Sequence, residues 1–283
     1  MDKISVVIPC YFNQGNIALL AKALIENEGA FKQSASFEYI LVDDGSEDKT
    51  WEKIQQFKAE FPDKVKGVKL STNVGSYSAI YAGLERATGD CIVIMAADLQ
   101  DPPAHINKLF AEWKKGSKLI LANRLNQAGS AGTYFGFLRR FGLKSLPKGG
   151  FDFCLFSKEL KEKLLHFQPK GANSLYHLLQ LEREPILVPY QKEERKTGRS
   201  RWTFFKKMAL ALCTIDRYSS LGLVHISVSL FLISATFLLG GVFVPGMSAL
   251  GILSMIGGIV FEIVRGILRG KQQDLIIVIE QVI

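Results

Sequence analysis

The chain has 283 residues, 48% of them hydrophobic, and a formal net charge of +8 at pH 7. This length is enough for one sizeable core and an additional part, and the basic charge indicates anionic partners such as nucleic acid, phospholipid headgroups or sugar-nucleotide phosphates. The four cysteines are widely separated and lack zinc-site spacing, so we expect reduced thiols and no disulfide framework. The N-terminal residues enter a strand pattern at once, and we expect no cleavable signal peptide.

Strand-like and helix-like segments alternate along the first 190 residues. Apolar and β-branched runs predict strands at 4–9, 37–42, 66–70, 91–97, 118–123, 151–156 and 185–190. Helices are predicted between them, at 17–25, 48–61, 76–87, 103–115, 158–166 and 174–182. This alternation predicts an α/β fold of right-handed βαβ units with a mainly parallel sheet.

The apolar run 91–97 is followed at once by Asp98, Gln100 and two prolines. Apolar residues on both faces of the run are typical of a strand buried between helices, and ligands of open α/β sheets bind where such strands end. The oxygen atoms of Asp98 and Gln100 suit Mg²⁺ or Mn²⁺ bridging to phosphates. The alternative is that Asp98 only caps the helix begun by the prolines, and this stretch alone does not decide between them.

Two further carboxylates, Asp43 and Asp44, follow the predicted strand 37–42. In a parallel sheet they converge with Asp98 on one crevice, where the acids repel each other unless a cation or a donor-rich ligand compensates. A nucleotide with a metal on its diphosphate supplies both. Asp44 also begins an Asp-Gly-Ser sequence that by itself is typical of a turn.

The tail has a different composition. Residues 219–244 contain a single potentially charged side chain, His225, and are long enough to cross a bilayer. After Pro245-Gly246 the apolar run resumes, and basic residues flank both outer ends, which indicates a helical hairpin with those ends in the cytoplasm. A buried hairpin of a soluble core is the alternative. We predict a domain at 1–205, a juxtamembrane amphipathic segment at 206–218, two transmembrane helices within 219–268 and a strand-like tail at 269–283.

Several motifs occur in the order known from one enzyme family. They are Val6–Asn13, Val42–Thr50, Asn73–Gly75, Gly89-Asp90, Ala97–Pro103, Gly150–Phe153 and Tyr190–Trp202. With them the chain resembles family 2 glycosyltransferases of the GT-A fold, especially dolichyl-phosphate mannose synthase and bacterial polyprenyl-phosphate glycosyltransferases. The resemblance covers nearly the whole chain, and its strength lies in the ordered set.

The resemblance implies inverting transfer of a sugar from a nucleotide sugar, with UDP-sugars favoured, to a polyprenyl phosphate such as undecaprenyl phosphate. It places the enzyme in the inner membrane with its catalytic domain in the cytoplasm, and implies Mg²⁺ or Mn²⁺ as cofactor. The implied nucleotide site consists of Pro9, Tyr11, Asn13, Asp43, Asp44, Asn73, Ala97 and Asp98. Asp98 and Gln100 are the implied metal ligands, and Asp98 and Asp152 the implied catalytic residues. The implied phosphate-binding residues are Arg124, Lys192, Arg195, Arg199 and Arg201.

The sequence departs from the family pattern at Ala96, where the family has the first acid of an Asp-x-Asp metal motif, and at Asn13-Gln14, which lacks an acid often found there.

Two other functions stay open. The acceptor could be a sugar hydroxyl, with Asp152 as a true base, or the chain could be a non-catalytic nucleotide-sugar-binding subunit. The basic loop could also be a solvated segment near anionic lipid. No nucleic-acid-binding motif is present, and the strand-like tail could pair between subunits in a homo-oligomer.

Overall fold

The computed structural model of the chain describes residues 1–31, 34–125, 143–167, 174–193 and 278–283, with short pieces at 135–136, 138–140, 210, 214, 257–259 and 263. The chain divides into two compact units. One consists of Met1–Phe135, Ser145–Arg201 and Ile276–Ile283, and the other of Gly136–Lys144 and Trp202–Leu275. The fold below is that of the first unit.

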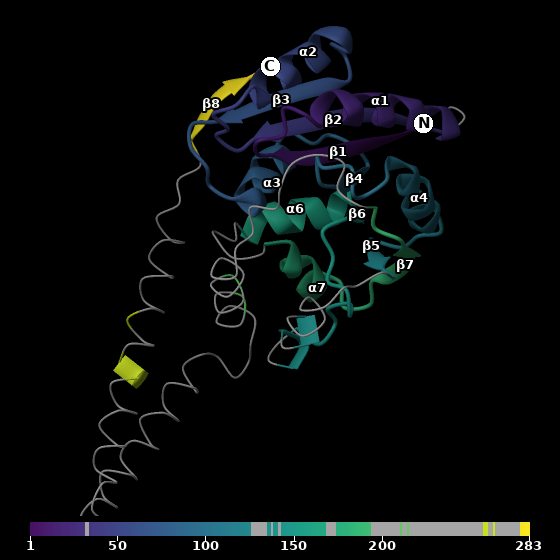
Figure 1. Ribbon diagram of the computed structural model, residues 1–283. Coiled ribbons are helices and arrows are strands. Elements are labelled where there is room, and N and C mark those ends of the chain that lie inside the picture. Colours follow the sequence, from purple (N-terminus) through teal and green to yellow (C-terminus); the bar gives the residue numbers. More distant parts are fainter. Residues whose placement is uncertain are drawn as a thin grey trace, which may run out of the picture. The chain divides into compact units, whose positions relative to one another are not determined.

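An eight-stranded sheet forms the middle of this unit, in the order β7-β5-β6-β4-β1-β2-β3-β8 (Figure 1). The strands are β1 (Asp2–Cys10), β2 (Ala35–Asp43), β3 (Val65–Leu70), β4 (Cys91–Ile94), β5 (Leu119–Arg124), β6 (Cys154–Ser157), β7 (Ile186–Tyr190) and β8 (Ile279–Val282). The pairs β1–β2, β1–β4, β2–β3 and β5–β7 are parallel, whereas β6 and β8 pair antiparallel with their neighbours. The predicted α/β fold with a mainly parallel sheet is confirmed.

Helices cover both faces of the sheet. The α-helices are α1 (Ile17–Glu28), α2 (Thr50–Glu60), α3 (Ser76–Leu84), α4 (Ile106–Lys114), α6 (Lys158–Phe167) and α7 (Leu178–Leu181), and the 3-10 helices are η1 (Gly29–Phe31), η2 (Pro103–His105) and η3 (Ser174–His177). Successive side chains of a strand point to opposite faces. Ile4, Val6 and Ile8 of β1 therefore join the core beneath α1, α2 and α4. Val7 points to the other face, against Gly83 of α3. The result is a three-layer arrangement around a buried sheet (Figure 1).

A buried carboxylate, Glu38, holds together the end of the sheet at which the parallel strands begin. Its oxygens accept hydrogen bonds from Ser5 Oγ at 2.5 Å and from the Thr88 backbone N–H at 2.6 Å. The ammonium groups of Lys3 and Lys66 each lie 2.9 Å away. A charge this deeply buried is tolerated because both of its oxygens are paired with donors and cations.

The Gly89-Asp90 motif belongs to this same end of the sheet. The Gly89 N–H donates to Ser5 Oγ at 2.7 Å, and Asp90 Oδ2 accepts from the Lys3 N–H at 2.8 Å. A Cβ atom at Gly89 would lie 2.7 Å from the Lys3 carbonyl oxygen, so the close approach requires glycine. The motif therefore has a structural explanation, far from the strand ends where ligands bind.

The C-terminal residues add the last strand. β8 pairs antiparallel with β3, and the Ser71 N–H donates to the Val278 carbonyl at 3.0 Å. The strand lies at 279–282, within the strand-like tail predicted at 269–283. The chain therefore rejoins the sheet at the end of β3, beside the loop that follows this strand.

No helix within the described ranges is long and apolar enough to span a membrane. The transmembrane helices predicted within 219–268 fall outside the described residues except for 257–259 and 263.

The Glu38→Gln variant tests the buried network. Burial raises the pKa of Glu38, but the hydrogen bonds from Ser5, Thr88 and the two lysines outweigh it and lower the pKa from 4.5 to about 2. A lowered carboxyl pKa stabilises the fold above the unfolded-state value, and this contribution is lost as the pH falls toward the folded-state value. We expect Glu38→Gln to lower the free energy of unfolding by about 2–3 kcal/mol at pH 7.

Urea unfolding of the full chain at several pH values measures this effect. The difference between wild type and Glu38→Gln should shrink as the pH falls below 4.5, the ordinary glutamate value. Glu85→Gln is the control, because the Glu85 side chain is 60% exposed and should contribute little to stability. A difference between wild type and Glu38→Gln that stays the same down to low pH would contradict the assignment.

Candidate functional site

The loops that follow β1 and β2 are joined by hydrogen bonds at one edge of the sheet. The Phe12 N–H donates to Ser46 Oγ at 3.0 Å, and the Asn13 N–H donates to Thr50 Oγ1 at 2.8 Å. Phe12 has a positive φ of 55°, which is uncommon for a non-glycine residue and is found most often at sites where a loop is tightly constrained. The two loops therefore form one rigid wall of the site.

The predicted nucleotide-binding residues Tyr11 and Asn13 lie in this wall, and the third one, Pro9, is the next-to-last residue of β1 just before it. Asn13 uses its Oδ1 to accept the Tyr11 N–H at 2.7 Å, and its carbonyl oxygen accepts the N–H groups of Asn16 and Ile17 at the start of α1. Asn13 thus shapes the loop that carries Tyr11. All three of the predicted residues are partly exposed, so they can contact a ligand.

Asp43, the last residue of β2, carries an unused acceptor. Its side chain is fully buried, and Oδ1 accepts the Ser46 N–H at 3.1 Å. Oδ2 is buried and has no hydrogen-bond partner among the described residues. Burial raises the pKa of Asp43, helped by the nearby charge of Asp48, while Ser46 and Lys69 oppose the shift. A buried acceptor of this kind needs a donor, and a ligand N–H or O–H would supply it.

Unlike Asp43, Asp44 has hydrogen-bond donors of the protein on both of its carboxylate oxygens. Asp44 accepts from Asn73 Nδ2 at 2.9 Å, from the Val74 N–H at 2.8 Å and from the Gly75 N–H at 3.0 Å. These bonds fasten the loop after β3 to the loop after β2. Burial raises the pKa of Asp44 to about 6, against the effect of the two backbone donors. A part of Asp44 or Asn73 in nucleotide binding stays a prediction.

A glycine completes the contact between these two loops. Gly45 has a φ of 65°, and a Cβ atom there would lie 2.5 Å from the Thr72 carbonyl carbon. Only glycine combines this backbone conformation with so close an approach. The Asp-Gly-Ser sequence is thus a turn and also the point at which two loops of the site pack together.

Another wall of the site is the segment after β4. This strand ends at Ile94 and not at Ala97 as predicted. The strand is shorter because its pairing with β1 ends there, followed only by a 3.3 Å bond from the Met95 N–H to the Val7 carbonyl. Ala97 is buried, and Leu99 has a positive φ of 59°. This turn brings Asp98, which is partly exposed, to the same edge as Asp43.

Asp98 and Gln100 fit a divalent cation that takes most of its ligands from elsewhere. Asp98 Oδ1 accepts the Gln100 N–H at 3.2 Å, and Gln100 Nε2 donates to the Glu193 carbonyl at 3.3 Å, which leaves the amide oxygen of Gln100 as its possible ligand atom. The described residues contain no group of three or more His, Cys, Asp or Glu side chains that could hold a metal. Two oxygen donors suit Mg²⁺ or Mn²⁺ only if phosphates and water complete the shell.

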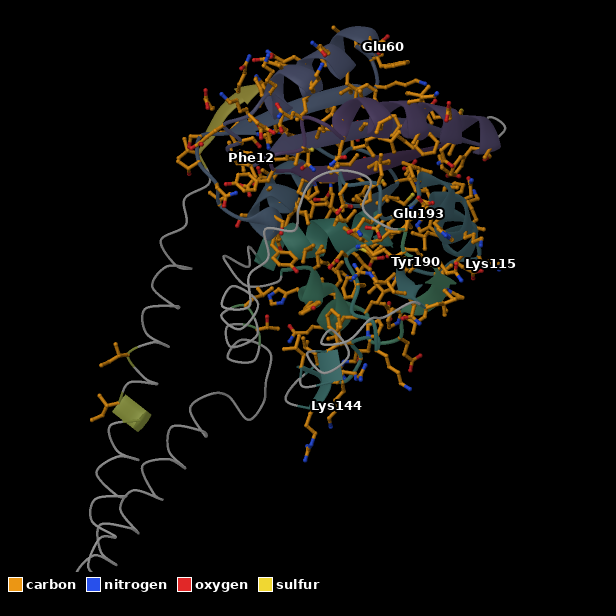
Figure 2. The ribbon with its side chains drawn as sticks, in the orientation of Figure 1. Phe12, Glu60, Lys115, Lys144, Tyr190 and Glu193 are labelled. Carbon is orange, nitrogen blue, oxygen red and sulfur yellow. The ribbon has the colours of Figure 1, made fainter. Side chains whose placement is uncertain are left out.

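A chain of charged and polar groups lies beyond this turn. Arg124, at the end of β5, pairs through Nη2 with Asp152, and its Nε donates to the Tyr190 hydroxyl at 3.2 Å. The Tyr190 hydroxyl donates to Asp101 Oδ1 at 2.6 Å, and Lys192 Nζ lies 3.6 Å from the same oxygen. Figure 2 labels Tyr190 at the end of β7 and Glu193 shortly after it. Three predicted residues, Arg124, Asp152 and Lys192, therefore belong to one cluster.

The charges of this cluster hold Asp152 in its ionised form. The side chain of Asp152 is 51% exposed. Its partial desolvation would raise the pKa, but Arg124 and Lys192 outweigh this effect and keep the pKa below the ordinary value of 3.8. For Arg124 burial disfavours the charge, and Asp152 and the Tyr190–Asp101 pair raise its pKa in spite of that. Asp152 is therefore a weak base beside two cations.

Two members of the cluster, Asp101 and Tyr190, were not among the predicted site residues. Both stand inside motifs that the sequence analysis used, Asp101 next to the candidate metal ligand Gln100 and Tyr190 at the start of the basic loop. Nothing in the sequence pairs them, since 89 residues separate them. The predicted phosphate-binding residues Arg195, Arg199 and Arg201 lie outside the described residues.

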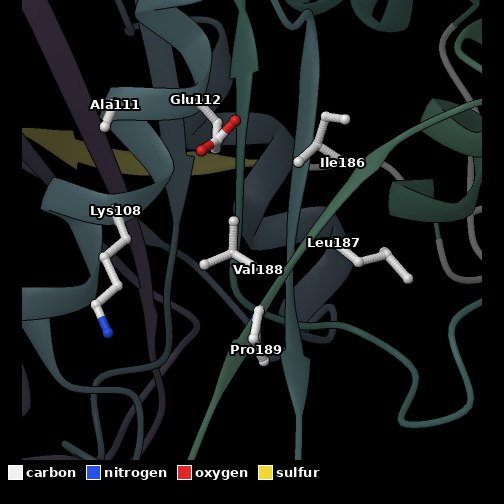
Figure 3. A pocket seen from close by; sticks show the side chains of 7 residues that line it. All are labelled: Lys108, Ala111, Glu112, Ile186, Leu187, Val188 and Pro189. Atoms are coloured by element: carbon white, nitrogen blue, oxygen red, sulfur yellow. The ribbon is translucent and has the colours of Figure 1, made fainter.

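A separate pocket lies between α4 and the edge strand β7 (Figure 3). Its lining consists of Lys108, Ala111, Glu112 and residues 186–189. None of these is a candidate site residue, and the polar groups at its rim belong to ordinary surface side chains. The pocket is therefore not part of the site formed by the strand ends.

Known proteins similar to this chain define its class. Residues 5–169 match the family described as Glycosyl transferase family 2, so the chain belongs to glycosyltransferase family 2 and is a glycosyltransferase. An uncharacterized glycosyltransferase of Synechocystis sp. is 28% identical over 280 residues, covering 91% of this chain and 86% of the relative. An undecaprenyl-phosphate 4-deoxy-4-formamido-L-arabinose transferase of Pectobacterium carotovorum is 28% identical over 217 residues, covering 74% of this chain and 65% of the relative.

A solved structure supports the fold. The mannosyltransferase PcManGT from Pyrobaculum calidifontis, in complex with GDP-Man and Mn²⁺, aligns with a TM-score of 0.55 at 15% identity, covering 95% of this chain and 84% of that chain. The predicted GT-A-like α/β fold is thereby confirmed.

The two neighbouring aspartates should respond differently to amidation. Asp44→Asn should lower the free energy of unfolding by about 1–3 kcal/mol, because an amide cannot accept all the partly buried N–H groups that Asp44 satisfies. Asp43→Asn keeps an oxygen for the Ser46 N–H and should change stability by less than Asp44→Asn does. Urea unfolding of both variants measures this difference. Equal losses would contradict the separate roles of the two carboxylates.

Proposed function

We propose that this glycosyltransferase moves a sugar from a nucleotide sugar, with UDP-sugars favoured, to a polyprenyl phosphate such as undecaprenyl phosphate, with inversion at the anomeric carbon. The observation that carries this proposal is the ion pair of Asp152 with Arg124, in the cluster that also contains Lys192. A sugar hydroxyl needs a base to remove its proton, whereas a phosphate oxygen is already anionic near neutral pH. A carboxylate that is paired with a cation is a weak base, and it suits an acceptor that needs no deprotonation.

Arg124 and Lys192 are the described residues that would hold the acceptor phosphate. A guanidinium grips phosphate oxygens through two parallel N–H bonds, and a lysine ammonium adds a point charge. Arg124 uses its Nε and one Nη2 hydrogen for Tyr190 and Asp152, so further N–H groups remain for a ligand. Arg195, Arg199 and Arg201 follow Lys192 in the sequence and would extend this group of cations.

The nucleotide would bind at the wall formed by the loops after β1 and β2. Asp43 Oδ2, buried and without a partner among the described residues, would accept an N–H of the base. Tyr11 and Pro9 would line the pocket. Both uracil and guanine offer an N–H donor, so Asp43 supports nucleotide binding without choosing the base.

Asp98 and Gln100 would hold Mg²⁺ or Mn²⁺ on the diphosphate of the donor. A cation there neutralises the charge that develops on the departing nucleoside diphosphate. Ala96 replaces one usual acid, so we expect the metal to bind weakly without the nucleotide. The relative whose name includes undecaprenyl-phosphate and the structural neighbour solved with GDP-Man and Mn²⁺ support the acceptor and the cofactor of this proposal.

The proposal includes attachment to the cytoplasmic face of the inner membrane through the predicted hairpin within 219–268, with the catalytic domain in the cytoplasm. Residues 219–244 contain a single potentially charged side chain, His225, and basic residues flank both outer ends of the predicted hairpin, which supports this attachment. Much of the rate would come from positioning the lipid phosphate beside the diphosphate of the donor.

The Asp98→Ala variant tests the metal and diphosphate assignment. We expect transfer to fall about 100-fold or more, because charge on the leaving group is no longer compensated. The variant should keep the wild-type melting temperature and lose the additional stabilisation that Mn²⁺ gives in the presence of a nucleotide sugar. Asp63→Ala, at an exposed position, is the control. Transfer at a rate near wild type by Asp98→Ala would refute the assignment.

The acceptor is tested with radiolabelled nucleotide sugars and the purified full chain in detergent. We expect label on polyprenyl phosphate and none on polyprenol, which lacks the phosphate. Arg124→Gln should raise the KM for polyprenyl phosphate about 10-fold or more while nucleotide binding stays unchanged, since a charge-assisted bond contributes about 1.5–3 kcal/mol. Arg183→Gln, an exposed arginine, is the matched control. Labelling of a glycolipid or polysaccharide hydroxyl in place of the lipid phosphate would overturn the proposal.

A further inference from the structure

Asp101 is a fully buried carboxylate for which neither the fold nor the proposed chemistry yet gives a reason. Oδ1 accepts the Tyr190 hydroxyl at 2.6 Å and lies 3.6 Å from Lys192 Nζ. Oδ2 is buried and has no hydrogen-bond partner among the described residues. Burying a carboxylate is costly, and an apolar residue at this position would avoid the cost. The side chain must therefore be explained by what it does to its two partners.

The Tyr190 hydroxyl links Asp101 to Arg124 through two hydrogen bonds. A tyrosine hydroxyl has one hydrogen, and that hydrogen points to Asp101, so the hydroxyl oxygen turns its lone pairs to Arg124 Nε at 3.2 Å. The ring is buried and packs edge-on against His105 at 5.3 Å and Phe153 at 5.9 Å. The hydroxyl therefore has little freedom to move away from either partner.

The guanidinium of Arg124 is consequently held at two of its nitrogen atoms. Nε is bound to Tyr190 and Nη2 is bound to Asp152, and the side chain is 17% exposed. Lys192, whose ammonium lies near the same Asp101 oxygen as the Tyr190 hydroxyl, has a side chain that is 18% exposed. Asp101 thus contacts one of the two cations directly and the other through a single hydroxyl.

We propose that Asp101 and Tyr190 form a positioning pair that fixes Arg124 and Lys192 beside Asp152 without touching the substrate. This inference rests on the proposed function in one respect, since it takes these two cations to be the binding site of the acceptor phosphate. The pair pre-organises the cations before the acceptor arrives, so that little ordering is left for the binding step. The specificity of the site for a phosphate acceptor then depends on two residues that never contact the phosphate.

The Tyr190→Phe variant removes the hydroxyl and keeps the ring. We expect the KM for polyprenyl phosphate to rise about 10-fold, while the KM for the nucleotide sugar and the slow hydrolysis of the donor in the absence of acceptor stay unchanged. Tyr39→Phe is the matched control, because Tyr39 is equally buried and its hydroxyl donates to Glu28 on α1 at 3.0 Å. The control should lower stability and leave both KM values unchanged. An unchanged acceptor KM in Tyr190→Phe, or equal changes in both KM values, overturns the inference.

A double-mutant cycle shows whether the two residues act as one unit. Asp101→Leu combined with Tyr190→Phe should raise the acceptor KM no more than the larger single effect, because either change removes the hydrogen bond between the two side chains and with it the connection to Arg124. Additive effects would mean independent structural roles and would overturn the pair.

A measurement without substrate separates this inference from the proposed function. The ionisation of Asp152 can be followed by NMR of its carboxyl carbon. A freely moving Arg124 would stabilise the Asp152 carboxylate less, so its pKa should be higher in Tyr190→Phe than in wild type. An unchanged value overturns the positioning pair even if the acceptor has been identified correctly. A raised value together with no transfer to lipid phosphate would instead refute the proposed acceptor and keep the pair.

Discussion

The candidate site depends on the parallel pairing of β1 with β2 and β4. Parallel strands all end at the same edge of a sheet, so the residues that follow them meet although they are far apart in the chain. Asp43 and Asp98 reach this edge from β2 and β4, and Tyr11 reaches it from β1. The same pairing buries the strands between two layers of helices. Each acid that arrives at this edge must then be compensated.

The buried carboxylates of this protein are compensated in different ways, and the differences separate structural from functional acids. Glu38 is paired with donors and two lysines at the far end of the sheet. Asp44 is satisfied by the loop that it fastens. Asp43, at the end of β2, keeps one oxygen that no described residue satisfies. An acid whose bonds are complete within the fold has no need of a ligand, and an incomplete one at a strand end is where a ligand is expected.

Much of the site could be predicted from the sequence, because its residues follow strands and occur in ordered motifs. The strand ends at Asp43, Asp98 and Arg124 were identified from apolar runs that stop at polar residues. The distinction between Asp43 and its neighbour Asp44 could not be predicted, since it depends on a loop 30 residues further along the chain. The link from Asp101 to Tyr190 was missed for the same reason. Hydrogen bonds between distant segments leave no periodic trace in a sequence.

By itself, the sequence determined the α/β class and the mainly parallel sheet, and its ordered motifs resemble those of glycosyltransferase family 2. The fold class follows from local chemistry, namely apolar periodicity and turn residues, which each segment carries independently of the others. Only the tertiary structure decided which carboxylates are satisfied and which are not, and that Asp152 is held in its ionised form by Arg124 and Lys192. The physical reason is that burial and charge compensation depend on distances across the fold. Such distances exist only once the chain has folded.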